Sequence, residues 1–163
     1  MPHKEQHYSN KDQSNSNKDQ SNPNKERNYQ IARDYCAAVT RGDLPDELLT
    51  PDMTAWITAG TVMDKTGYQQ AVRLLAEMLA EPLVFTIQSL TADEDRVVIE
   101  ATSRGTLING ERYEQTYVFV IRVRDGRIAS VAEHYNALVA KEKLVPLMAA
   151  AAERLAARSA DQS

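Results

Sequence analysis

Hydrophobic and polar residues alternate most regularly over residues 113–136, and this alternation predicts a hairpin of two long strands. The Asp-Gly pair at 125–126 lies between the two runs, and this dipeptide is the strongest short-range signal of a tight hairpin turn. On the second strand Val131, Glu133 and Tyr135 share one face, which places an acidic side chain among apolar neighbours. Because both faces of the hairpin carry apolar residues, we expect both faces to be covered.

Outside the hairpin, the spacing of apolar residues predicts helices and shorter strands. Apolar stripes at helical spacing run through residues 28–41, 67–80 and 144–155, and a short helix is predicted from Asp43 onwards. Further strands are predicted over residues 53–58, 61–63, 83–90 and 96–107. This order indicates an α+β domain in which a cone-shaped, curved antiparallel sheet wraps around N-terminal helices, with an additional C-terminal helix. The hollow of such a cone is a typical site for a small molecule.

Residues 1–27 form a polar segment with an internal repeat. The heptad SNKDQSN occurs twice in succession, and apart from Met1 the segment has no aliphatic side chain. Such a segment cannot bury enough apolar surface to offset the entropy lost on ordering, so a disordered tail is predicted. The folded domain is expected over residues 28–137, and residues 138–163 are expected to form a helical extension.

The composition excludes several classes of partner. The net charge is −4, and acidic residues outnumber basic ones outside the tail, so nucleic acid is not an expected partner. No apolar run is long enough to span a bilayer, and no membrane association is expected. The single cysteine, Cys36, excludes an internal disulfide and fits the reducing cytoplasm, where we expect the protein to act. Two of the three histidines lie in the tail, and neither a metal nor any other cofactor is expected.

Three segments carry a family resemblance: ARDYCAAVTRGD, LTPDMTAWITAG and NGERYEQTYVFVIRVRDGRIASVAEHYN. They resemble the nuclear transport factor 2-like superfamily, in particular its SnoaL-like and ketosteroid isomerase-like branch, over residues 28–137. The resemblance implies a cone-shaped fold, a pocket between sheet and helices, and a homodimer through the outer face of the sheet. Members include isomerases, polyketide cyclases, epoxide hydrolases and non-catalytic binding modules, so function has to be argued from the site.

Residues of the ketosteroid isomerases can be carried over by position. Their first-helix tyrosine matches Tyr35, their base falls on Ile57, and their second acid falls on Phe119. The last two positions are apolar in this chain. The resemblance therefore implies that isomerase chemistry with that set of acids is absent here, because neither a proton acceptor nor an oxyanion donor occupies those places.

The limonene epoxide hydrolase-like members imply a second set of positions. Their arginine falls on Glu100, its aspartate on Thr102, and their first-strand tyrosine and asparagine fall on Trp56 and Thr58. Their last acid falls on Glu133, so one acid of that set is retained while the arginine is replaced by an acid. In the polyketide cyclases an aspartate transfers the proton, and Glu133 could take its place.

The predicted site is a pair of carboxylates in one partly apolar cavity. Glu100 and Glu133 are the expected catalytic residues, with Tyr35 as a third candidate on the pocket floor. Two carboxylates in a dry site cannot both ionise cheaply, so one is held protonated and the pair supplies an acid and a base. The residues expected to bind the substrate are Trp56, Thr58, Thr102, Tyr117, Phe119 and Tyr135.

Two functions follow from this site. The first is a protein that acts on or binds a small apolar carbonyl or epoxide compound by carboxylate acid–base chemistry, of the isomerase, cyclase or epoxide hydrolase type. The alternative is a non-catalytic ligand-binding or dimerisation module, in which Glu100 and Glu133 are tied up by arginines such as Arg104. A further idea is that the alanine-rich C-terminal helix closes the mouth of the cone or docks a partner.

A homodimer is expected on two grounds, exposed sheet edges and an apolar outer face of the sheet. The outer face is predicted to carry Val97, Ile99, Val118 and Val120.

Overall fold

The computed structural model describes residues 23–161 of the 163-residue chain. For residues 1–22 the predicted disorder lies outside the described residues. For residues 23–27 the prediction is wrong, because helix α1 (Pro23–Arg41) already begins at Pro23. Two tertiary contacts hold this early start: Asn28 donates through Nδ2 to the carbonyl of Asp93 at 2.9 Å, and the guanidinium of Arg27 lies directly over Gly126.

The sheet has six strands in the order β2-β1-β6-β5-β4-β3. Strands β3 to β6 pair antiparallel with their sequence neighbours, as the sequence predicts, whereas β1 runs parallel to β6 and the sheet is therefore mixed rather than wholly antiparallel. The strands are β1 (Leu49–Ile57), β2 (Val62–Asp64), β3 (Val84–Asp93), β4 (Arg96–Thr106), β5 (Arg112–Arg124) and β6 (Arg127–Tyr135).

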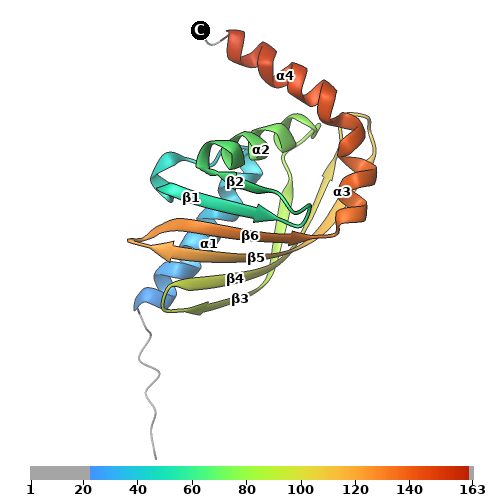
Figure 1. The fold of residues 1–163 in the computed structure, drawn as a ribbon. Helices are drawn as coiled ribbons and strands as arrows, with labels where there is room; N and C mark the ends of the chain where they lie inside the picture. The colour runs from blue at the N-terminus through green and yellow to red at the C-terminus, as the bar shows by residue number, and fades with distance from the viewer. Residues whose placement is uncertain (1–22, 162–163) are drawn as a thin grey trace, which may run out of the picture.

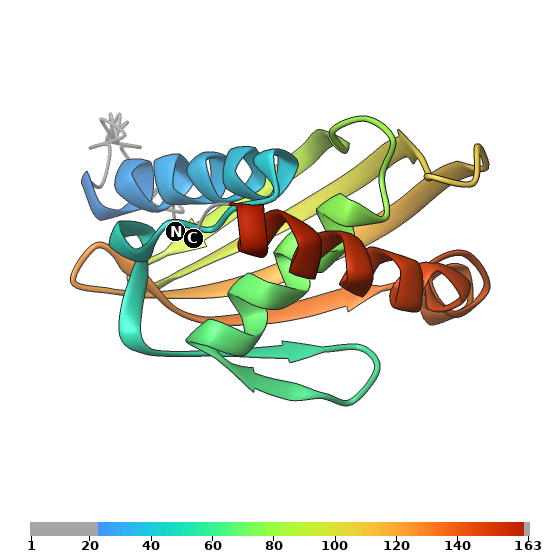
Figure 2. The ribbon, with the colours of Figure 1, turned by 90° about the horizontal axis from the view of Figure 1, so that it is seen from above.

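Helices cover one face of this curved sheet, which confirms the predicted α+β class and its cone-like form. Helices α1 and α2 lie on the same face, and α4 crosses back over α2 (Figures 1 and 2). The remaining helical segments are η1 (Asp46–Leu48), α2 (Lys65–Glu77), α3 (Ala137–Lys143), η2 (Val145–Leu147) and α4 (Met148–Asp161). Within residues 23–161, no helix has both the length and the apolar character needed to cross a membrane.

The tight turns form where the sequence predicts them. Asp125 and Gly126 both have positive φ, 52° and 72°, which is the backbone of a two-residue hairpin turn. Gly110 of the second predicted turn has a φ of 83°. These turns fix the antiparallel order of the last strands.

The main core lies between the concave face of the sheet and helices α1 and α2. On β4 the inward residues are Val97, Ile99 and Ala101, and all three are buried. The prediction that Val97 and Ile99 face outwards is therefore wrong. The pairing with β5 shows the reason: Ile99 stands opposite Phe119, which faces the core, and directly opposed residues share a face.

The C-terminal helix is fastened to α2 by a buried carboxylate. The side chain of Glu77 is only 5% exposed and pairs with Arg154 at 3.3 Å and Arg158 at 3.1 Å. Next to this contact, Leu147 and Ala151 are buried in a second apolar cluster with Met78. The last helix therefore packs against α2 along one side, and most of its other residues are exposed.

Helices α1 and α2 approach each other closely at Gly42, the residue just after α1, and a substitution there tests this contact. Its φ is 74°, and a Cβ there would lie 2.4 Å from the Cβ of Ala76. Gly42→Ala is expected to lower the free energy of unfolding by about 1–3 kcal/mol, because left-handed strain and overpacking add. Gly110→Ala is the matched control: its φ is also positive but nothing lies within 4 Å, so only strain of about 1 kcal/mol is expected. Urea denaturation measures both, and equal losses would contradict the close approach.

Candidate active site

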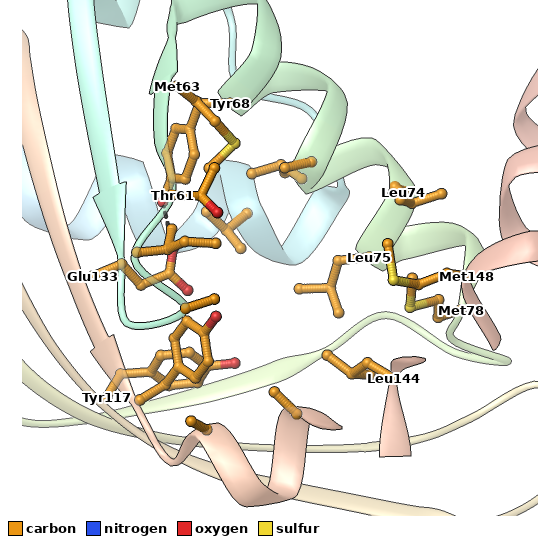
Figure 3. Close-up of a pocket in the computed structure, with 18 of the residues that line it drawn as sticks. Thr61, Met63, Tyr68, Leu74, Leu75, Met78, Tyr117, Glu133, Leu144 and Met148 are labelled. Carbon is orange, nitrogen blue, oxygen red and sulfur yellow. Dashed lines mark hydrogen bonds between the residues drawn. The ribbon is translucent and has the colours of Figure 1, made fainter. Parts of the chain in front are cut away.

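A cavity of about 430 Å³ lies between the sheet and the helices (Figure 3). Its walls are mostly apolar, with a few hydroxyl groups and one carboxyl group. The lining residues include Tyr35, Ile57, Tyr68, Ala71, Leu74, Leu75, Met78, Tyr113, Tyr117, Phe119, Glu133, Tyr135, Lys141, Leu144 and Met148. Four layers of the fold contribute to it: α1, α2, the sheet, and the C-terminal segment from α3 to α4.

Glu133 points into this cavity from β6. It stands opposite Phe119 on β5 and beside Ile57 on the parallel strand β1, and both neighbours also line the cavity. Its backbone carbonyl accepts hydrogen bonds from the backbone N–H of Thr58 at 3.0 Å and the Thr58 hydroxyl at 3.2 Å. The Thr58 hydroxyl in turn accepts from the N–H of Tyr135 at 3.0 Å. Thr58 thus fixes the backbone of β6 at Glu133 and at Tyr135.

A chain of two tyrosines ends on the Glu133 carboxylate. The hydroxyl of Tyr68, on α2, donates to Oε2 of Glu133 at 2.8 Å, and the hydroxyls of Tyr68 and Tyr35 lie 2.5 Å apart. Each hydroxyl carries one hydrogen. Because Tyr68 uses its hydrogen on Glu133, Tyr35 must donate to Tyr68. Residues from α1, α2 and β6 therefore meet in one directed hydrogen-bond chain.

The electrostatics of this chain favour a proton-exchanging carboxyl group. Burial raises the pKa of Glu133 to about 7, while the hydrogen bond from Tyr68 acts in the opposite direction. Burial, followed by the negative charge of Glu133, raises the pKa of both Tyr35 and Tyr68 well above its usual value. The tyrosines stay protonated as donors, and Glu133 changes charge near neutral pH.

A second pair of tyrosines lies on β5. The hydroxyls of Tyr113 and Tyr117 are 3.2 Å apart, and the ring of Tyr117 stacks on Phe119 at a centroid distance of 5.0 Å. Burial raises the pKa of both tyrosines. One hydrogen is shared between the two oxygens, and the pair retains a second hydrogen that can be donated to a ligand. In Figure 3 the side chains of Glu133 and Tyr117 both point into the cavity.

Several of the predicted site residues lie elsewhere. Glu100 does not face the cavity: it is exposed on the outer face of the sheet and accepts a hydrogen bond from the Ser89 hydroxyl at 2.5 Å. Thr102 follows it on the same outer face. Residues two apart on a strand share a face, and in β4 the odd-numbered positions Val97, Ile99 and Ala101 face the core. The predicted pair of carboxylates in one cavity therefore does not form.

Two residues predicted to bind the substrate from the first strand, Trp56 and Thr58, also lie outside the cavity. Trp56 alternates with Ala55 and Ile57, which face inwards, and its ring packs against His134 at a centroid distance of 5.0 Å. Thr58 is not a lining residue and instead supports the β6 backbone, as described above.

The other predicted residues do line the cavity: Tyr35, Tyr117, Phe119, Glu133 and Tyr135. Tyr68 was missed as a functional residue, because the sequence places it in the buried stripe of a helix. The available signal was a single hydroxyl-bearing side chain in an otherwise aliphatic stripe. Helical spacing does not show which strand the Tyr68 hydroxyl reaches, because Tyr68 and Glu133 are 65 residues apart in the sequence.

The family of the chain is shown by its sequence. The family model of the SnoaL-like domain matches residues 32–131. The chain belongs to the SnoaL-like domain family. Among curated proteins, the uncharacterised protein YesE of Bacillus subtilis (strain 168) is 42% identical over 53 residues. Those residues are 32% of this chain and 36% of YesE, so the chain matches about a third of the length of that relative.

Solved structures share the nuclear transport factor 2-like fold of this SnoaL-like domain. A candidate isomerase from Bacillus subtilis superposes with a TM-score of 0.63 at 24% identity, over 72% of this chain and 92% of that one. IdmH, a candidate polyketide cyclase from Streptomyces antibioticus, superposes with a TM-score of 0.61 at 24% identity, over 71% and 96% of the two chains. AclR, a candidate hydroxylase from Streptomyces galilaeus, gives 0.62 at 21% identity, over 84% and 96%. At these identities the likeness shows the fold alone.

The raised pKa of Glu133 should be visible in the stability of the SnoaL-like domain. Between the ordinary pKa of 4.5 and the folded value of about 7, the folded state binds more protons than the unfolded state, so stability falls as pH rises through this window. The effect is about 3 kcal/mol for a shift of this size. Other carboxylates titrate as well, so the quantity to measure is the difference in unfolding free energy between wild type and Glu133→Gln. That difference should shift in favour of the variant from pH 4.5 to pH 7.5, and a pH-independent difference would contradict the buried, titrating carboxyl group.

Proposed function

We propose that this protein binds a small, largely apolar carbonyl compound and moves a proton at the carbon next to the carbonyl. The observation that carries this proposal is the Glu133 carboxyl group, which projects into an apolar cavity and is hydrogen-bonded by Tyr68 at 2.8 Å. A pKa of about 7 suits a group that both takes up and returns a proton near neutral pH.

In the forward step, ionised Glu133 accepts the proton from the carbon, and negative charge develops on the carbonyl oxygen. The Tyr113–Tyr117 pair is the group proposed to receive that oxygen, because it retains a hydrogen to donate and lines the same cavity. The chain from Tyr35 through Tyr68 holds the carboxylate in place. In an isomerisation, protonated Glu133 then returns its proton to a different carbon of the ligand. In a ring closure, the enolate carbon bonds to a second carbonyl carbon of the ligand, the π bond of that carbonyl breaks, and Glu133 returns its proton to the resulting alkoxide oxygen.

The geometry favours proton transfer at carbon over epoxide hydrolysis. Hydrolysis by paired carboxylates needs a second acid in the cavity, and Glu100 lies on the outer face of the sheet. Glu133 is the sole carboxyl group among the residues that line the cavity. The descriptions of two structural neighbours, a candidate isomerase and a candidate polyketide cyclase, fit the same reaction class.

A second candidate function is binding of the same kind of ligand without turnover. It is favoured by the way Tyr68 and Tyr35 satisfy the carboxylate within the protein itself. A buried polar group with its hydrogen bonds made can serve purely to shape a pocket. The two functions differ in one measurable property, exchange of a carbon-bound proton.

The proton-transfer step can be tested without knowing the natural substrate. The protein should accelerate exchange of the hydrogens next to the carbonyl of 2-tetralone, a small apolar ketone, in D₂O as followed by proton NMR. Glu133→Gln should lower the accelerated rate by about 100-fold or more, the scale of general base catalysis. The matched control is Glu100→Gln, which changes the same side chain on the outer face and should leave the rate unaltered.

Two outcomes would contradict the catalytic proposal. One is equal exchange by wild type and Glu133→Gln. The other is tight binding of the ketone with no exchange above buffer, which would establish the binding module instead.

We also propose that the protein forms a homodimer through the outer face of the sheet. Val118 is 38% exposed there, and Val98 and Val120, opposed across β4 and β5, are partly buried on the same face. Contiguous apolar surface of this kind typically marks a protein interface.

We also propose a cytoplasmic location. The one cysteine, Cys36, is a free, buried thiol whose burial raises its pKa to about 12, and a free thiol fits a reducing compartment.

Two exposed valines should respond differently to substitution if the outer face of the sheet forms the dimer interface. Val118→Glu places a charge at the centre of the proposed interface and should convert the dimer to monomer, because a buried unpaired charge costs several kcal/mol. Val62→Glu is the control, since Val62 is 68% exposed on the edge strand β2, outside the valine patch. Light scattering of the wild type and both variants measures the mass. A monomeric wild type, or a Val118→Glu dimer, would refute the interface.

A further inference from the structure

The lining of the cavity carries one charged side chain of each sign. Among the residues that line it, Glu133 is the one acid and Lys141, on α3, is the one base. Lys141 is exposed to solvent, whereas Glu133 is partly buried. Because a lining residue that is exposed borders the opening of a cavity, we assign Lys141 to the mouth and Glu133 to the interior. The mouth is therefore positive and the interior is neutral or negative, depending on the proton of Glu133.

The charge of Lys141 is available to a ligand. Within residues 23–161, no carboxylate forms an ion pair with its ammonium group. Lys143, two residues further along the same helix, is different: it pairs with Glu111 at 2.5 Å and does not line the cavity. Two lysines of one short helix thus differ in both partner and position.

Much of the remaining wall is apolar. Leu74 and Leu75 come from α2, Met78 is the residue that caps the end of α2, and Leu144 and Met148 come from the C-terminal segment (Figure 3). A ligand that fills this space must present an apolar body to these side chains. A ligand anion next to Glu133 would be repelled by its charge or would raise the pKa of that group further, whereas an anion at the mouth would be attracted by Lys141.

We infer that the ligand is an organic anion with an apolar body, bound with its anionic group at Lys141 and its neutral end at Glu133. This inference rests on the proposed function only in that the cavity binds a small molecule; it does not depend on the reaction. Lys141 is a specificity-determining residue in this arrangement. It selects and orients a carboxylate, sulfonate or phosphate group and never touches the reacting atoms.

A pair of fluorescent probes isolates the role of the anion. 1-Anilinonaphthalene-8-sulfonate and N-phenyl-1-naphthylamine share one apolar body, and only the first carries a sulfonate. Lys141→Gln should weaken binding of the sulfonate probe about 3- to 5-fold, the range of a partly exposed ion pair, and leave the neutral probe unchanged. The loss should shrink at high salt, because the attraction is screened. Lys143→Gln is the matched control and should leave both probes unchanged.

A cavity-filling variant shows that the probes bind in the cavity. Ala71 lines it from α2, and Ala71→Trp should weaken both probes. Retained binding in Ala71→Trp, an unchanged sulfonate affinity in Lys141→Gln, or an equal loss in Lys143→Gln would overturn the inference. If the wild type binds neither probe, small-molecule binding itself fails and the proposed function falls with it. If the wild type binds the neutral probe and Lys141→Gln leaves the affinity for the sulfonate probe unchanged, only the inference about the anion fails.

Discussion

The chemistry of the site depends on one carboxyl group, Glu133, which lies in an apolar cavity and is not paired with a cation in the described part of the chain. Within residues 23–161, the side-chain partner of the Glu133 carboxylate is the hydroxyl of Tyr68, and no basic group pairs with it. Burying a charge is costly unless it is compensated, and a neutral donor compensates only in part. The result is a carboxyl group poised between two protonation states, with a pKa of about 7. An arginine in place of Tyr68 would have fixed the charge and removed this property.

Local patterns were sufficient to predict the α+β class from the order of elements, and the alternation of side chains along each strand of the hairpin. Tyr117 and Phe119 share one face of β5, and Val131, Glu133 and Tyr135 share one face of β6. The turn alone, which pairs Arg124 with Arg127, would set Glu133 opposite Val118 on the outer face. A β-bulge between Arg122 and Val123 shifts the pairing by one residue and sets Glu133 opposite Phe119 instead. The inward position of Glu133 was therefore predicted by the family resemblance and not by the turn.

The rest of the site depends on contacts that local patterns do not record. Glu100 was placed in the cavity by counting along β4 from a family position, and a count in error by one residue reverses the face of every side chain. Tyr68 was read as core because helical spacing shows which face is buried but not which strand it meets. The parallel pairing of β1 with β6 was missed for a related reason, since it joins segments at opposite ends of the domain.

The directed chain of hydroxyls also has a consequence for how the molecule is made. Tyr35 and Tyr68 are 33 residues apart, and Tyr68 and Glu133 are 65 residues apart, so the chain closes two long loops. Such closures cost entropy before they return any contact energy, and they slow folding. During synthesis, the helices that supply both hydroxyls leave the ribosome well before the strand that supplies the carboxylate. The growing polypeptide therefore carries its apolar inner faces uncovered until β6 is complete, and the site exists only once translation has passed the end of the domain.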